Sequence, residues 1–198
     1  MTYGIFLSCI ISYILGSYPT AYFIIRMFER KNIFESGDKN MGGTNGLIIS
    51  KSYKIFFLIG LVDILKSFFA AVTSYYIIKD FWLAALLSGI FSTLGHNYSV
   101  FKNFKGGKGA STNAGTFFFI NPSMMVLFLL SIMVLSLSNK KLNFTNNEFV
   151  ESIYRMILFL TLTSLFFPDF FIHALVLQSL SVLKYATEGQ FSKKILEF

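Results

Sequence analysis

Long apolar runs alternate with short polar segments along the whole chain. The apolar runs cover residues 3–25, 55–78, 81–100, 109–121, 122–137, 152–167 and 170–185. A helix that crosses the hydrocarbon core of a bilayer needs about 20 apolar residues, and most of these runs approach that length. The pattern predicts an all-α integral membrane protein with seven transmembrane helices and a single domain over residues 1–198, because no repeat or low-complexity linker divides the chain.

The run from 109 to 137 allows two interpretations, because Asn121 and Pro122 interrupt it. Proline lacks a backbone donor and clashes with the preceding turn, so the run is either two short helices or one kinked helix. The charges favour two helices, since Lys140 and Lys141 then lie on the same side of the membrane as the other basic loops.

The densest basic segment is the polar stretch 26–54. The positive-inside rule predicts that this stretch is cytoplasmic, so the N-terminus lies outside. Seven crossings then place the C-terminus in the cytoplasm, and we expect a multi-pass protein of the cell (inner) membrane with its polar loops facing inward. The basic residues of the stretch are Arg26, Arg30, Lys31, Lys39, Lys51 and Lys54.

Composition supports a membrane protein, since 54% of the 198 residues are hydrophobic and only 14% are charged. Soluble domains carry about 25% charged residues. The net charge of +7 is explained by lysines that attract anionic headgroups, so membrane lipids are expected partners and nucleic acid is not. With Cys9 as the single cysteine and two histidines, His96 and His173, we expect no metal and no cofactor.

One polar stretch, residues 95–112, concentrates glycines and lysines between two apolar runs. Glycine lets backbone N–H groups approach an oxyanion closely, and lysine adds a mobile charge. A helix that begins near Lys108 would point its free N–H groups at the loop. These features are typical of a phosphate-binding loop, although a basic loop that only sets topology is the alternative. The candidate phosphate ligands are Lys105, Gly106, Gly107, Lys108, Gly109, Ser111 and Thr112.

Charged and polar side chains elsewhere extend this candidate site. Asp63 and Lys66 share one face of a predicted helix, either as a structural ion pair or as groups that border the site. His96 precedes the glycine-lysine loop and is either a structural histidine or a candidate proton acceptor. A substrate phosphate could accept the proton instead. Residues 36–46 form a second polar loop, which is either a flexible surface loop or a source of amide and hydroxyl groups.

Four segments together resemble the bacterial acyl-phosphate:glycerol-3-phosphate acyltransferase family, known as PlsY. They are residues 16–19, 40–45, 63–66 and 95–112, in matching order over about the first 115 residues. The resemblance implies a seven-helix inner-membrane enzyme that moves a fatty acyl group from acyl phosphate to the 1-position of glycerol 3-phosphate. The products would be lysophosphatidic acid and phosphate, in the first committed step of phospholipid synthesis.

The expected roles follow from the resemblance and from the chemistry of acyl phosphate, whose phosphate is already a good leaving group. Positioning of two phosphate-bearing substrates is then the main task. We expect His96, Lys108 and Asn45 to be catalytic and Asn40 and Thr44 to orient substrate beside the phosphate ligands given above. The predicted positioning residues are Ser17, Asp63, Lys66 and Glu188.

The chain departs from the family pattern at several positions. Asp38 stands in place of a serine, Ile48 in place of an arginine and Ser99 in place of a proline. The family's third motif survives only as residues 186–188, with His173 one helical turn before the position of the motif's histidine. Two further interpretations therefore stay open: an organic-phosphate transporter and a catalytically inactive relative. The residues in place of the motif's His, Asn and Arg are Val176, Ser179 and Val182.

Overall fold

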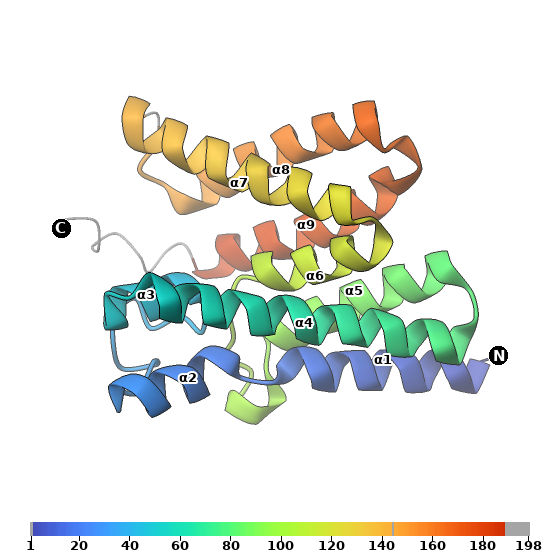
Figure 1. Ribbon diagram of the computed structural model, residues 1–198, viewed down its shortest axis with the longest axis horizontal. Coiled ribbons are helices and arrows are strands. Elements are labelled where there is room, and N and C mark those ends of the chain that lie inside the picture. Colours follow the sequence, from blue (N-terminus) through green and yellow to red (C-terminus); the bar gives the residue numbers. More distant parts are fainter. Residues whose placement is uncertain (1, 144, 189–198) are drawn as a thin grey trace.

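The structure is a computed structural model that describes residues 2–143 and 145–188, and every long element in this part of the chain is an α-helix (Figure 1). Two short 3-10 turns, Val100–Lys102 and Pro168–Phe170, accompany the helices. The helices are α1 (Thr2–Ser17), α2 (Thr20–Glu29), α3 (Gly43–Ser50), α4 (Tyr53–Ile78), α5 (Phe81–Asn97), α6 (Ala110–Ile120), α7 (Pro122–Leu142), α8 (Glu148–Phe166) and α9 (Phe171–Glu188).

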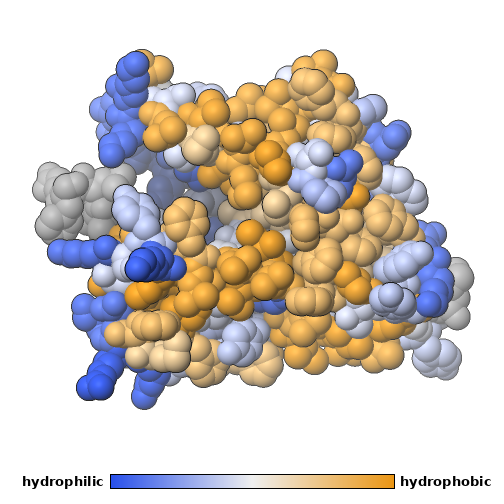
Figure 2. Space-filling model, in the orientation of Figure 1, coloured by the Kyte–Doolittle hydropathy of each residue, from blue (hydrophilic) through white to orange (hydrophobic). Residues whose placement is uncertain are grey.

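Five helical segments in the described residues are long and apolar enough to cross a membrane: Thr2–Glu29, Tyr53–Ile78, Pro122–Leu142, Glu148–Phe166 and Pro168–Thr187. Figure 2 shows a belt of hydrophobic side chains across the middle of the molecule, with hydrophilic side chains gathered toward its two ends. Exposing such a belt to water is unfavourable, whereas contact with the apolar tails of lipids is not. The predicted all-helical membrane fold is confirmed at this level, while the count of seven crossings stays a prediction.

The break at Asn121 and Pro122 separates two helices, which decides between the two interpretations of residues 109–137. Asn121 is the N-cap of α7, and its side chain accepts a hydrogen bond from the backbone N–H of Ser123 at 2.9 Å. Pro122 occupies the first turn of α7, where its missing N–H would be unsatisfied anyway. α6 is therefore a separate helix of 11 residues.

Close backbone contact joins α1 to α5. A Cβ on Gly16 would lie 2.1 Å from the Ser92 carbonyl oxygen, and one on Gly95 would lie 2.2 Å from the Tyr13 carbonyl oxygen. Small residues let membrane helices approach this closely. The helix then ends at Ser17, and α2 begins at Thr20, so Tyr18 and Pro19 form the break between them.

Buried hydroxyl groups link the central helices along their length. Ser67 of α4 lies 2.9 Å from both Ser92 of α5 and Thr116 of α6, measured between side-chain oxygens. A second group joins Ser8 and Ser12 of α1 to Ser74 of α4. Such bonds stabilise helix association in a membrane, where polar groups have no water to bind. They fix how α1, α4, α5 and α6 face one another.

The polar loops collect at one end of the bundle. Figure 1 places the loop before α3, the start of α6 and the ends of α7 and α9 at the same end of the molecule. His173 belongs to the opposite end, where its Nε2 lies 3.2 Å from the Trp82 carbonyl oxygen. Trp82 and His96 lie near opposite ends of α5, roughly 20 Å apart along a helix. His173 is therefore far from His96 and cannot replace a side chain of the candidate site.

Candidate active site

A buried group of three ionisable side chains lies where α4 and α5 approach the loops. The Lys66 ammonium is 2.8 Å from Asp63 Oδ1 and 3.0 Å from His96 Nδ1. It also donates to the Tyr18 carbonyl oxygen at 3.1 Å, in the break between α1 and α2. The predicted pairing of Asp63 with Lys66 on one helical face is present, and His96 joins it.

The Lys66 contact determines which nitrogen of His96 carries the proton. An ammonium group has three donors and no acceptor, so His96 Nδ1 accepts from Lys66. The imidazole then carries its hydrogen on Nε2, an assignment made from the hydrogen-bond network. In this form His96 presents a donor, and not a base, at Nε2.

The glycine-lysine loop packs directly on His96. Gly107 N–H donates to the His96 carbonyl oxygen at 3.0 Å. A Cβ on Gly107 would lie 2.2 Å from His96 Nε2 and 2.9 Å from the Met41 carbonyl oxygen, so only glycine fits here. The loop therefore fills the space between the end of α5 and the segment that leads into α3, and the two polar loops of the sequence prediction are in contact.

The predicted helix after Lys108 begins at Ala110, with Gly109 as its N-cap at φ +84°. That left-handed conformation suits glycine. Thr112 is fully buried, and its hydroxyl has no hydrogen-bond partner among the described residues. Ser111 lies on the side of α6 that faces α4, with its hydroxyl oxygen 3.8 Å from where a Cβ on Gly60 would be.

Asn45, on α3, holds the preceding loop together. Its side-chain amide donates to the carbonyl oxygens of Ile33, Ser36 and Asn40, and its oxygen accepts from Asp38 N–H at 2.9 Å. An amide with this many backbone partners is engaged without substrate. The geometry therefore favours a positioning role for Asn45, and its predicted catalytic role is untested.

The other predicted ligands in this loop differ in their surroundings. Asn40 is partly buried, and its side-chain oxygen has no hydrogen-bond partner within the described residues. Thr44 is exposed in the first turn of α3. Asp38, which stands where the family has a serine, accepts a hydrogen bond from Asn40 N–H at 2.9 Å. Asn40 therefore has a buried side-chain oxygen that is available to a ligand.

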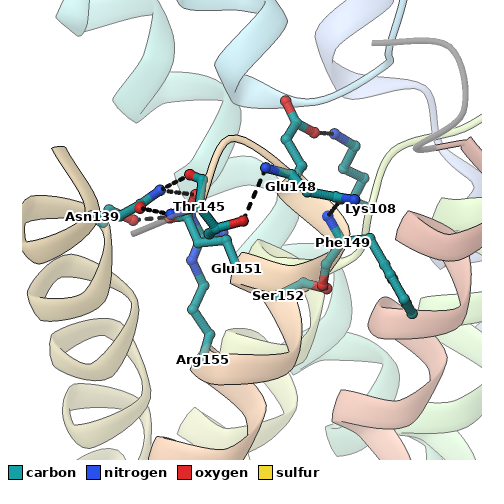
Figure 3. A network of polar contacts seen from close by, with 10 residues as sticks. Lys108, Asn139, Thr145, Glu148, Phe149, Glu151, Ser152 and Arg155 are labelled. Carbon is teal, nitrogen blue, oxygen red and sulfur yellow. Dashed lines mark hydrogen bonds and ion pairs between the residues drawn. The ribbon is translucent and has the colours of Figure 1, made fainter. Parts of the chain in front are cut away.

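Lys108 is held by two residues from the second half of the chain. Figure 3 shows its ammonium paired with the carboxylate of Glu148 in the first turn of α8, and it also lies 4.5 Å from the centre of the Tyr185 ring. Burial lowers the pKa of Lys108, but Tyr185 and Glu148 outweigh this effect and hold the pKa above the ordinary value for lysine. Lys105, by contrast, has an exposed side chain, so the two lysines of the predicted clamp do not share one environment.

The connection between α7 and α8 places Glu148. Asn147 caps α8 by accepting from Phe149 N–H at 2.9 Å, and acidic residues in a first helical turn suit the helix dipole. Asn139 at the end of α7 donates to the Thr145 carbonyl oxygen at 3.0 Å and to Glu151 at 3.1 Å (Figure 3). Sequence reasoning missed Glu148, because no local pattern relates it to a lysine 40 residues earlier.

Two of the predicted positioning residues lie at the ends of helices. Ser17 ends α1, and its carbonyl oxygen accepts a hydrogen bond from the Ser99 hydroxyl at 2.5 Å, which ties the kink to the glycine-lysine loop. Glu188 is the last residue of α9, and its side chain lies outside the described residues.

Sequence reasoning assigned no role to two further buried residues, Asn97 within the stretch 95–112 and Lys184 on α9. Asn97 is 1% exposed at the end of α5, and Lys184 is 4% exposed near the end of α9. A charged residue inside an apolar run is a signal for function in membrane proteins, so Lys184 was open to detection from the sequence. Asn97 carried no such signal.

Fold and site together define a multi-pass helical membrane protein whose buried ionisable group lies under two contacting polar loops. The sequence matches the family model described as glycerol-3-phosphate acyltransferase over residues 6–191. The chain therefore belongs to the glycerol-3-phosphate acyltransferase family.

Individual relatives agree with this assignment. The chain is 37% identical over 131 residues to the glycerol-3-phosphate acyltransferase of Limosilactobacillus reuteri (strain DSM 20016), covering 66% of this chain. That match spans only 62% of the relative's length. The enzyme of the same name from Macrococcus caseolyticus (strain JCSC5402) is 30% identical over 175 residues, which cover 88% of this chain and 82% of the relative.

A solved structure has the same fold. It is the glycerol 3-phosphate form of PlsY, described as an integral membrane glycerol 3-phosphate acyltransferase. The TM-score is 0.74 at 25% identity, with 92% of this chain and 88% of the other chain covered. The lysophosphatidic acid form matches with a TM-score of 0.72.

Proposed function

We propose that the chain transfers a fatty acyl group from acyl phosphate to glycerol 3-phosphate, giving lysophosphatidic acid and phosphate for phospholipid synthesis. Family membership supports this proposal, as do the names of the relatives and of the solved PlsY forms. The observation that carries it is the contact of Gly107 with both His96 and the Met41 carbonyl oxygen. This contact unites the basic loop, the Asn40–Asn45 loop and the buried ion pair in one place.

The membrane setting is part of the proposal. We infer seven crossings, with the N-terminus outside and the C-terminus in the cytoplasm, so that the site opens to the cytoplasmic side of the inner membrane. Residues 1–198 then act as one domain. The gathering of the basic loops at one end supports this orientation. The acyl chain of the donor would lie among the apolar helices, with membrane lipids around it.

Lys108 and the loop amides hold the phosphate of a substrate in this mechanism. A cation and N–H groups stabilise the charge that develops on a departing phosphate. Lys108 must first exchange the Glu148 carboxylate for substrate, and the partial exposure of that carboxylate supports such an exchange. Gly106, Gly107 and Gly109 let the backbone approach, while Asn40, Thr44, Ser111 and Thr112 orient the two substrates.

The reaction itself is an attack of the glycerol hydroxyl oxygen on the acyl carbonyl carbon. The bond from that carbon to the phosphate oxygen breaks, and the phosphate leaves with the electron pair. The contact between Lys66 and His96 Nδ1 supports a donor role for His96 Nε2, toward charge on the carbonyl oxygen or on phosphate. Substrate phosphate then accepts the hydroxyl proton, which is the second of the two acceptors that the sequence allowed.

The test is an assay of the purified protein with palmitoyl phosphate and glycerol 3-phosphate, scored for lysophosphatidic acid. Wild type should form the product, and Lys108→Met should not. Lys79→Met is the matched control, because Lys79 is an exposed lysine that caps the C-terminal end of α4, away from the polar loops of the candidate site. If wild type forms no lysophosphatidic acid but takes up glycerol 3-phosphate into proteoliposomes, the transporter interpretation would be established instead. The absence of both lysophosphatidic acid and uptake would indicate an inactive relative.

A further inference from the structure

Asn97 is buried without hydrogen-bond partners. Its side chain is 1% exposed, and neither its amide nitrogen nor its oxygen finds a partner among the described residues. A buried polar group without a partner is costly to the folded protein. Such a group persists where something else, such as a ligand, completes its hydrogen bonds.

The Asn97 amide faces the start of α6. A Cβ on the N-cap Gly109 would lie 2.9 Å from Asn97 Oδ1 and 3.1 Å from the Ser181 hydroxyl of α9. Gly109 therefore packs closely among α5, α6 and α9, with these polar atoms around it. The first N–H groups of α6 and its positive dipole end are directed to the same place, and both favour an anion.

Lys184 brings a cation to this place. It follows Ser181 by one turn of α9, is 4% exposed, and its ammonium lies 4.2 Å from the centre of the Tyr98 ring. Tyr98 directly follows Asn97 in the chain.

We propose that Asn97 and Lys184 bind the phosphoryl group of a substrate from the α9 side of the glycine-lysine loop. The inference rests on the proposed function, and it adds two binding residues to which the sequence analysis gave no role. An amide and an ammonium can both donate to phosphate oxygens, and the charged donor forms the stronger bond. Both substrates carry such a group, so either glycerol 3-phosphate or acyl phosphate fits the chemistry.

The first experiment compares Asn97→Leu and Lys184→Met with wild type in the acyl transfer assay. We expect each change to raise the KM for one of the two substrates about tenfold, the effect of one lost hydrogen bond to a charged group. A rise confined to glycerol 3-phosphate assigns its phosphate to these residues, and a rise confined to palmitoyl phosphate assigns the donor. KM values for both substrates within about twofold of wild type in both variants would overturn the proposal.

A stability measurement separates binding from structure. Leucine at position 97 removes two unsatisfied polar atoms, so the melting temperature without substrate should stay the same or rise. A lower melting temperature together with unchanged KM values would instead give Asn97 a structural role. Lys79→Met is the control for Lys184→Met, since Lys79 also lies over a tyrosine ring, 5.1 Å from the centre of Tyr76, but at the other end of the molecule.

A binding measurement keeps this inference separate from the proposed function. If wild type shows no acyl transfer, the proposed function fails, and the rise in melting temperature caused by glycerol 3-phosphate or inorganic phosphate still reports on the residues. Loss of that rise in both variants, but not in Lys79→Met, would support Asn97 and Lys184 as phosphate ligands. An unchanged rise in both variants, or no rise in wild type, would refute them.

Discussion

The ammonium group of Lys108 is paired with the carboxylate of Glu148, 40 residues further along the chain. This contact joins the glycine-lysine loop to the first turn of α8. The lysine is thereby oriented before any substrate arrives, and an incoming phosphate has to compete with the carboxylate. The second half of the chain thus takes part in the candidate site through Glu148 as well as through α9.

Replacing Glu148 by glutamine should strengthen phosphate binding. The change removes a negative charge that competes for Lys108, and because this carboxylate is 41% exposed the gain should be only a few-fold in KM. Steady-state kinetics with both substrates would measure it, with Asp169→Asn at the far end of the molecule as the control. A KM that rises in Glu148→Gln would mean that Glu148 serves mainly to position Lys108.

Replacing Lys108 should affect the transition state more than the fold. Lys108→Met is expected to lower kcat/KM at least about 100-fold, the size seen when one donor to a developing charge is removed. Lys108→Arg keeps the charge but not the shape, so it should recover part of the loss. Comparable kcat/KM values for Lys108→Met and wild type would contradict the proposed role, provided that both proteins elute as single species in detergent.

The charge on Lys108 should persist across the usable pH range, because its pKa lies above the ordinary lysine value despite the opposing effect of burial. Its contribution to stability is therefore fully present below the unfolded-state pKa of about 10.4 and is lost only as the pH rises through the folded-state pKa. We expect the Lys108-dependent part of binding to stay constant between about pH 6 and pH 9. A loss of affinity over this range that is absent in Lys108→Arg would show that Lys108 deprotonates earlier.

A methyl group at position 107 should disrupt the site. The Cβ of Gly107→Ala would lie 2.2 Å from His96 Nε2 and 2.9 Å from the Met41 carbonyl oxygen, so both polar loops would have to move. Displacements of about 1 Å can cost about 100-fold in rate. Gly42→Ala is the matched control, because its Cβ would meet nothing within 4 Å. Equal acyl transfer rates for the two variants would show that the loop tolerates displacement.

The buried hydroxyl contacts of α4 should contribute to stability. Ser67→Ala removes side-chain contacts to Ser92 and Thr116, each 2.9 Å long. Interhelical hydrogen bonds in membranes contribute about 0.6 kcal/mol on average, up to about 1.7. Unfolding in detergent should therefore show a loss of that order for Ser67→Ala, and a much smaller one for the exposed Ser164→Ala. Equal losses in the two variants would mean that these contacts do not hold the helices together.

Local patterns in the sequence were sufficient for much of this architecture. Proline chemistry indicated the break at Pro122, and the three-residue spacing of Asp63 and Lys66 placed both on one helical face, as the structure has them. Two partners of the candidate site had no local signal. Glu148 contacts Lys108 only because the fold brings α8 next to the glycine-lysine loop. Asn97 is distinguished from other asparagines at helix ends only by its buried side chain without hydrogen-bond partners among the described residues.

Lys105 illustrates a further limit of sequence reasoning. The sequence placed both Lys105 and Lys108 in the predicted phosphate clamp. In the structure the Lys105 side chain is exposed, whereas Lys108 contacts residues of α8 and α9. The direction of a loop side chain depends on backbone dihedrals that composition does not reveal. The left-handed conformations of Asn103 and Phe104, just before Lys105, belong to that hidden information.

The brevity of α6 has a consequence for where chemistry happens. Its 11 residues rise about 16 Å, roughly half the thickness of the hydrocarbon core. A loop in front of so short a helix cannot stand clear of the bilayer if the far end of the helix reaches the opposite surface. If α6 does reach the opposite surface, the glycine-lysine loop lies within the bilayer. The proposed fatty donor could then present its carbonyl carbon to the loop without leaving the membrane.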